Sequence, residues 1–138
     1  MNCKLLAGVA CIVLASCQLA QPSGKESQTT WKNFAQHSVD EYFSLAPNDA
    51  VYQGNHHFDG QLPDWSEAGL KAYAAFLHKT IDDANDYTKV DKTDAFERDY
   101  WVQVAEGKLF FLEDADQPHH NPAFYTGALD PNVYVSRD

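Results

Sequence analysis

Apolar side chains recur every three or four residues along three long stretches of the chain, which is the spacing of one face of an α-helix. The first helix is expected over residues 31–46. Thr29 or Thr30 can cap its start, and Pro47 ends it because the residue before a proline avoids the helical region. Its predicted apolar stripe comprises Trp31, Phe34, Ala35, Ser38, Val39, Tyr42, Phe43 and Ala46.

A short second helix is expected over residues 47–53, with Pro47 in its first turn and Gly54 as its stop. Ser66 can cap the next long helix. This helix should fray over residues 85–88, because carboxylates near a helix C-terminus oppose the helix dipole. Its apolar stripe is formed by Leu70, Tyr73, Ala74, Leu77, Ile81 and Ala84, and the carboxylates near its end are Asp82, Asp83 and Asp86.

The third long helix is predicted to run from a Thr93 cap to about Asp114. Its apolar face is wide, which is expected of a helix that is contacted on two sides. One side of that face carries Phe96, Tyr100, Val104 and Phe111, and beside them lie Trp101, Ala105, Lys108 and Leu112.

The segments between these stretches lack an apolar period. Residues 54–66 are rich in turn formers and predict a structured loop, and two prolines interrupt residues 117–125. No pair of strands is convincing, so the predicted class is all-α. We expect a signal peptide and tether, followed by three to four amphipathic helices that form part of a larger helical protein.

The N-terminus carries the three parts of a secretory signal: a positive start with Lys4, an apolar run over residues 5–14, and small residues before a cleavage point. The apolar run is too short to span a bilayer. Leu14-Ala15-Ser16-Cys17 has the form of a bacterial lipobox, in which the cysteine thiol accepts lipid and becomes the first mature residue. An ordinary cleaved signal is the alternative. Residues 1–16 are thus a predicted signal peptide, and residues 17–29 a lipidated cysteine with a flexible tether.

Composition narrows the possible functions. Cys3, Cys11 and Cys17 are the three cysteines, so no disulfide or thiolate metal site can form after residue 17. Removal of residues 1–16 would leave nine Lys and Arg against twenty Asp and Glu, a formal charge near −11. This balance argues against nucleic acid and against anionic lipid as partners.

The aromatic content suggests that the helices belong to something larger. All eighteen Phe, Tyr and Trp lie between Trp31 and Tyr134, and a small body would struggle to bury them all. Residues 132–138 also read as a segment in mid-course. We therefore expect residues 30–138 to be the N-terminal region of a larger domain, with the rest of the same polypeptide as partner. The alternative is a complete small lipoprotein with a partner-binding face.

Three groups of polar residues are candidates for chemistry. His56, His57 and Asp59 share one loop and could tie that loop by hydrogen bonds, contact substrate, support a site or ligate a metal. The second group is Glu113, Asp114, Asp116, His119 and His120. It could bind a divalent ion weakly, although carboxylates at a helix end are more often solvated.

The third group is Asp82, Asp83, Asp86, Asp91 and Asp94. It lacks the residue order of a calcium-binding loop, and we interpret it as a solvated face.

The familiar catalytic motifs are missing from the sequence. It contains no His-Glu-x-x-His zinc motif, no Gly-x-Ser-x-Gly nucleophile elbow and no glycine-rich phosphate loop. We therefore assign no catalytic residue and no metal ligand to this chain.

Several short segments occur along the chain in a distinctive order: Tyr42-Phe43-Ser44-Leu45-Ala46-Pro47 with Ala50, Gly54-Asn55-His56-His57-Phe58-Asp59, Leu62-Pro63-Asp64-Trp65-Ser66, Asp99-Tyr100-Trp101 and Asn121-Pro122-Ala123-Phe124-Tyr125. Their order resembles the N-terminal region of a bacterial family called domain of unknown function 885. Members of that family are mostly helical, often exported lipoproteins, and are regarded as zinc metallopeptidases. The resemblance implies that the zinc motif lies downstream of the matched region.

The expected function is therefore the lipid-anchored N-terminal part of an exported, zinc-dependent peptidase-like protein, without the catalytic motif in this chain. The resemblance implies helices that form a wall of the peptidase cleft, with the loop of His56, His57 and Asp59 near substrate. The residue after the lipidated Cys17 is Gln18 and not aspartate. Under the usual lipoprotein sorting rule, this predicts delivery of the protein to the outer membrane, where it would face the periplasm. The alternative function, from a different class, is a small acidic lipoprotein that acts as an envelope binding or assembly module.

Overall fold

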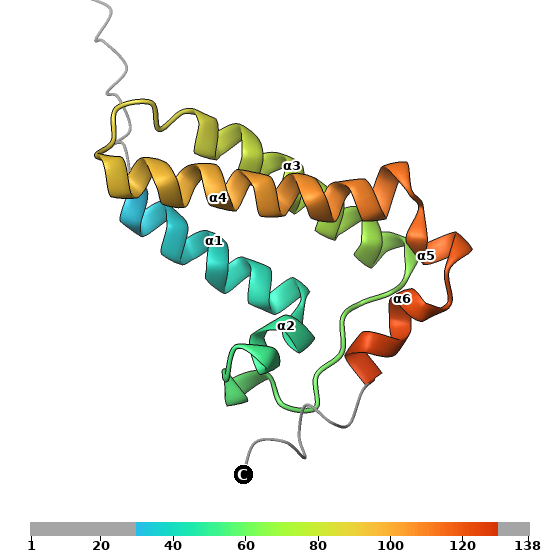
Figure 1. The fold of residues 1–138 in the computed structure, drawn as a ribbon. Coiled ribbons are helices and arrows are strands. Elements are labelled where there is room, and N and C mark those ends of the chain that lie inside the picture. Colours follow the sequence, from blue (N-terminus) through green and yellow to red (C-terminus); the bar gives the residue numbers. More distant parts are fainter. Residues whose placement is uncertain (1–29, 130–138) are drawn as a thin grey trace, which may run out of the picture.

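Three long helices form the body of the protein in this computed structural model, which describes residues 30–129 (Figure 1). They are α1 (Trp31–Leu45), α3 (Glu67–Asn85) and α4 (Lys92–Leu109). No strand occurs within residues 30–129, so the predicted all-α class is confirmed. The signal peptide, Cys17 and the tether lie outside the described residues, as does the segment 130–138. None of the described helices is both long and apolar enough to cross a membrane.

Short helical pieces connect the long helices and extend the chain below them (Figure 1). Helix α2 follows α1 directly, and α5 and α6 follow the end of α4 on the other side of the molecule. The bounds are α2 Pro47–Tyr52, η1 His56–Phe58, the π-helical turn η2 Phe110–Asp114, α5 Gln117–His120, α6 Ala123–Thr126 and η3 Gly127–Leu129.

The helix starts and stops of the first half agree with the sequence expectations. The Thr30 hydroxyl accepts a hydrogen bond from the Asn33 amide at 3.4 Å, and the Ser66 hydroxyl accepts one from the Gly69 amide at 3.1 Å. Both are N-cap contacts, which satisfy a backbone donor that has no partner within the helix. Pro47 lies in the first turn of α2, and Gly54 follows the helix with a φ of 85° that favours glycine.

Helix α4 begins two residues earlier than predicted, and its cap is a different residue. The Asp91 carboxylate accepts hydrogen bonds from the amides of Thr93 and Asp94, at 2.8 and 2.9 Å. Thr93 is therefore the second residue of the helix and not its cap, and Asp91 has a structural role that the prediction of a solvated face missed. A carboxylate is an effective cap because it accepts two amides and also faces the positive helix end.

Within residues 30–129, helix α4 is packed on only one of the two sides on which its wide apolar face predicts contacts. Phe96, Tyr100 and Phe111 are 71%, 64% and 53% exposed, whereas Ala105 is fully buried. The second of the two predicted rows faces the core, since Ala105 belongs to the core cluster and Trp101 and Leu112 pack against it. The π-helical turn at η2 then adds an extra residue per turn and shifts which side chains face outward.

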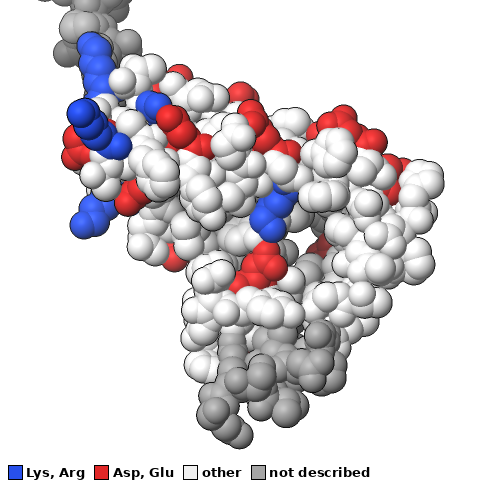
Figure 2. Space-filling model, in the orientation of Figure 1, with Lys and Arg blue, Asp and Glu red and all other residues white. Residues whose placement is uncertain are grey.

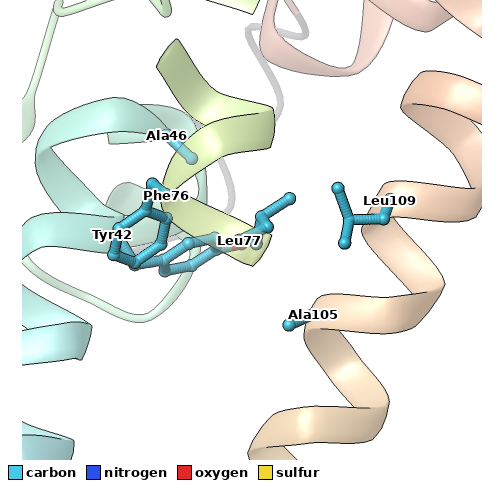
Figure 3. Packing of buried hydrophobic residues seen from close by; sticks show 6 residues of the cluster. All are labelled: Tyr42, Ala46, Phe76, Leu77, Ala105 and Leu109. Atoms are coloured by element: carbon cyan, nitrogen blue, oxygen red, sulfur yellow. The ribbon is translucent and has the colours of Figure 1, made fainter. Parts of the chain in front are cut away.

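The core lies where α1, α3 and α4 meet (Figure 3). Leu77 of α3 is fully buried and points between the α1–α2 side and α4, beside Phe76 and opposite Leu109. Burial of a leucine of this kind stabilises a fold by about 1.5–3 kcal/mol. The core cluster is Tyr42, Ala46, Phe76, Leu77, Ala105 and Leu109.

A second contact ties the start of α1 to α4 and to the connection between α3 and α4. The Trp31 indole N–H donates to the Glu97 carboxylate at 3.2 Å. The rings of Trp31, Phe34 and Tyr87 lie 5.1–5.6 Å apart, within the range of favourable aromatic pairs. Helix α1 is thus held at its start by these contacts and at its end by Tyr42 of the core cluster.

Candidate functional site

A cleft of about 420 Å³ lies between α2, the start of α3, α4 and the α6–η3 segment. In Figure 2, basic and acidic side chains meet at the edge of a hollow below α4. Concave sites with mostly apolar walls and a few polar groups are the usual places for small ligands. The residues that define the walls include Leu45, Asp49, Tyr52, Pro63, Asp64, Trp65, Leu70, Tyr73, Lys108 and Phe124.

Asp49 is the centre of the polar contacts in this cleft. Its Oδ2 accepts hydrogen bonds from the Tyr42 hydroxyl and from Lys108 Nζ, the latter at 3.0 Å. Its Oδ1 accepts one from the Asn48 amide group at 2.9 Å. Lys108 Nζ also lies 5.1 Å from the centre of the Tyr42 ring, a cation–π contact. Asp49 therefore joins α1, α2 and α4 at one point.

Two tyrosines beside Asp49 stay neutral. Burial raises the pKa of Tyr42 well above its usual range, and the nearby Tyr73 and Asp49 raise it further. Burial likewise raises the pKa of Tyr73, with a further contribution from the charge of Asp49. Phenols held in this state act as hydrogen-bond donors and not as nucleophiles or bases.

A second hollow of about 390 Å³ shares Asp49, Tyr52 and Lys108 with the cleft, and its other walls come from α1, Gln53 and α4. Trp101 lines this hollow. The Trp101 indole nitrogen is buried and is the one buried side-chain polar atom without a hydrogen-bond partner in the part of the chain that the structure describes. The Asp49–Lys108 pair thus lines both hollows.

The loop with the first predicted histidines does not line the cleft. His56 Nδ1 lies 3.0 Å from Asp59 Oδ2, and the Asn55 side chain accepts a hydrogen bond from the His57 amide. The His57 ring packs edge-on against Phe58 at 5.3 Å. These contacts hold the residues in the short helix η1, which follows α2.

The second predicted group is organised around a residue that sequence reasoning did not include. His119 Nε2 lies 2.7 Å from Glu67 Oε1, and its Nδ1 bonds Asp116. His120 Nδ1 lies 2.9 Å from the other Asp116 oxygen. Asp116 has a φ of 42°, a left-handed conformation that turns the chain into α5. The group therefore fastens α5 to the first turn of α3.

The carboxylates next to His119 favour its protonated form. Hydrogen bonds to Glu67 and Asp116 raise the pKa of His119 to about 9. The hydrogen bond to His119 lowers the pKa of Asp116. The sequence favoured solvated carboxylates at this helix end. In the structure, a protonated His119 also bridges the carboxylates of Glu67 and Asp116. Glu113 belongs elsewhere and pairs with His78 at 2.9 Å.

The described residues do not fit a metal centre. Within residues 30–129, no three His, Cys, Asp or Glu side chains are grouped so that they could hold a metal ion. We therefore derive no chemical step through zinc in this part of the chain. In the acidic set from the sequence, Asp91 caps α4 and Asp83 pairs with Lys79, while Asp82 and Asp86 are exposed.

The polar centre of the cleft was missed because its members are far apart in the sequence. Asp49 and Lys108 are separated by 59 residues. One signal was available: Lys108 falls in the apolar row of α4, and a lysine in such a row needs an acceptor nearby. The sequence could not indicate which acidic residue supplies that acceptor.

Comparisons of the chain with protein-family models, with curated proteins and with solved structures found no match. The geometry by itself suits binding more than chemistry. The polar groups around Asp49 are already engaged with one another, and the two tyrosines are held neutral.

Proposed function

We propose that this chain is the lipid-anchored N-terminal helical part of an exported, peptidase-like protein. Three features support the proposal: the lipobox that ends at Cys17, the resemblance of the ordered motifs after Trp31 to the family named above, and an outer helical face suited to contact with further protein. In this proposal zinc is held by residues outside this chain, and the remainder of the same polypeptide is the partner.

The observation that carries the proposal is the aromatic outer face along α4 and η2. Phe96, Tyr100, Phe110 and Phe111 are each more than half exposed. The rings of Phe96 and Tyr100 stack at 6.5 Å, and those of Phe110 and Phe111 pack at 5.4 Å. Neighbouring large apolar side chains exposed on one face mark a surface that binds another protein surface. The four residues define what we call the outer aromatic face.

The cleft and the loop of His56, His57 and Asp59 have assigned places in this proposal. The described helices form part of the wall of a larger peptidase cleft, and the loop, which does not line the 420 Å³ cleft itself, approaches the substrate of that larger site. In the full-length enzyme, His56→Ala and Asp59→Ala should raise KM without loss of stability. Unchanged KM and turnover in both variants, with unchanged unfolding midpoints, would remove the loop from the site.

The coding DNA after Asp138 provides the decisive test. The proposal expects an open reading frame of hundreds of codons that reaches a helix with His-Glu-x-x-His, since that spacing places two zinc ligands one helical turn apart. A stop codon directly after Asp138 in the native gene would overturn it. That result would favour the small acidic lipoprotein, which would use its outer aromatic face to bind an envelope partner.

A further inference from the structure

The aromatic walls of the cleft are held in place by contacts outside it. The Trp65 ring packs edge-on against Tyr125 at 5.3 Å, and the Tyr125 hydroxyl donates to the Pro118 carbonyl at 2.7 Å. Tyr73 is half-buried and lies against Tyr42 of the core, while Tyr52 is 57% exposed at the edge of the cleft. The cleft thus presents supported aromatic surfaces around an open volume of about 420 Å³.

The charges of the cleft are unequal. Among the described residues that line it, the charged ones are Asp49, Asp64 and Lys108. Lys108 and Asp49 offset each other at 3.0 Å. Asp64 is left as the uncompensated charge, and hydrogen bonds from Ser66 lower its pKa, so it stays ionised. The Ser66 amide donates a hydrogen bond to Asp64 Oδ1 at 2.9 Å.

Aromatic walls together with an excess carboxylate favour the binding of a positively charged ligand. An ammonium or guanidinium is attracted to the faces of Trp and Tyr rings, and a nearby carboxylate adds a direct charge contact. The whole chain carries a formal charge of −10, which favours positive ligands at longer range as well. An anion would instead meet two carboxylates and a single ammonium that is already paired.

We propose that the cleft binds an organic cation on an apolar stem, of the kind presented by an arginine or lysine side chain of a peptide. Asp64 pairs with the charged head at the mouth, and Trp65, Tyr73 and Phe124 contact the stem. The site goes beyond the proposed function, because binding at it can be measured whether or not a peptidase part follows this chain.

Nuclear magnetic resonance on the purified full-length protein tests the site directly. The indole N–H signal of Trp65, assigned with Trp65→Phe, is followed during titration with three probes of similar stem length. The probes are N-acetyl-arginine amide, the neutral N-acetyl-norleucine amide and the anionic N-acetyl-glutamate amide. We expect saturable shifts with the arginine probe at the lowest concentration, and weaker binding in high salt, because screening reduces an exposed charge contact.

Asp64→Asn isolates the contribution of the charge. Asparagine retains an oxygen that can accept the Ser66 amide, so the turn before α3 is preserved. The arginine probe should bind roughly fivefold to tenfold more weakly to this variant, from the loss of one carboxylate at a separation of a few ångströms. Asp82→Asn is the matched control, since it removes the same charge from an exposed position on α3 that does not line the cleft.

The possible outcomes separate clearly. Preference for the arginine probe, together with weaker binding in Asp64→Asn alone, supports the site. Equal or tighter binding of the glutamate probe, equal affinities in the two variants, or no saturable shift with any probe would overturn it. Circular dichroism of each variant shows that the comparison is made between folded proteins.

Discussion

Single side chains with several partners hold the helices of this protein together. Asp49 binds the hydroxyl of Tyr42, the ammonium of Lys108 and the amide of Asn48, and these donors come from α1, α4 and α2. Tyr42 is only 7% exposed. A donor that is buried in this way costs free energy whenever its acceptor is removed.

The first prediction concerns Asp49. Asp49→Asn should lower the free energy of unfolding by about 1–3 kcal/mol, because a neutral amide loses the ion pair with Lys108 and its NH₂ group, in place of Oδ1, cannot accept the hydrogen bond from the Asn48 side chain. Urea unfolding monitored by circular dichroism measures this loss. Asp82→Asn carries the same change of charge on an exposed face, and we expect an effect within about 0.5 kcal/mol. Equal unfolding midpoints for the two variants would contradict the role of Asp49.

The second prediction concerns the pH dependence that His119 confers. Its pKa is raised from 6.5 to about 9 by Glu67 and Asp116, so protonation is favoured in the folded state. The resulting stability is fully present below pH 6.5 and is lost as pH rises through about 9. In His119→Asn, the fall of the unfolding midpoint between these two pH values should be smaller than in the natural protein.

His57→Asn serves as the control for that experiment, because His57 is an exposed histidine outside the Glu67–Asp116 group. Its pH profile should follow that of the natural protein. A profile for His119→Asn that is also unchanged would show that the bridge between α5 and α3 does not contribute to stability.

At the level of whole helices, the ends are set by local contacts and can be tested one at a time. Asp91→Ala should destabilise the protein by about 1 kcal/mol, because the amides of Thr93 and Asp94 lose their acceptor at the start of α4. Thr93→Ala should cost less than about 0.5 kcal/mol, since Thr93 is already inside the helix. Denaturant unfolding of both variants decides which residue is the cap, and a larger cost at Thr93 would reverse the assignment.

Two helical glycines should respond to alanine in opposite directions. A Cβ added to Gly107 of α4 meets nothing within 4 Å, so Gly107→Ala should stabilise the protein by about 0.5–1 kcal/mol through helix propensity. A Cβ at Gly69 would overlap the backbone oxygen and side chain of Asp64, so Gly69→Ala should be destabilising. Thermal unfolding of the pair measures both signs. Stabilisation by both variants would mean that Asp64 does not pack on the first turn of α3.

At the scale of the whole molecule, the proposed function has to account for two things: what covers the outer aromatic face, and how the protein is attached to a membrane. The described body packs one side of α4 and leaves the rings of Phe96 and Tyr100 outward. Contact with a further part of the same polypeptide is the proposed answer. Attachment to a membrane is proposed to come from lipid on Cys17 and not from charge, since the chain is strongly acidic.

The final prediction tests that attachment. Cells that express the protein should incorporate labelled palmitate into it, and Cys17→Ser should abolish the label, because the lipid is attached through that thiol. Cys11→Ser removes a neighbouring cysteine within the predicted signal and should leave the label intact. Label retained in Cys17→Ser, or lost equally in both variants, would contradict lipidation at Cys17.

Local sequence was enough to predict the all-α class and most of the helix ends. The three- and four-residue spacing of apolar side chains, the caps at Thr30 and Ser66 and the stop at Pro47 depend on neighbours within a turn or two, so they can be read along the chain. Packing determined the rest. Helix α4 has apolar residues on two sides, and only the positions of α1 and α3 select the side of Ala105 over that of Phe96. The pairs Asp49–Lys108 and Glu67–His119 join residues 59 and 52 positions apart, and no local pattern specifies which distant partner the folded chain brings within hydrogen-bond distance.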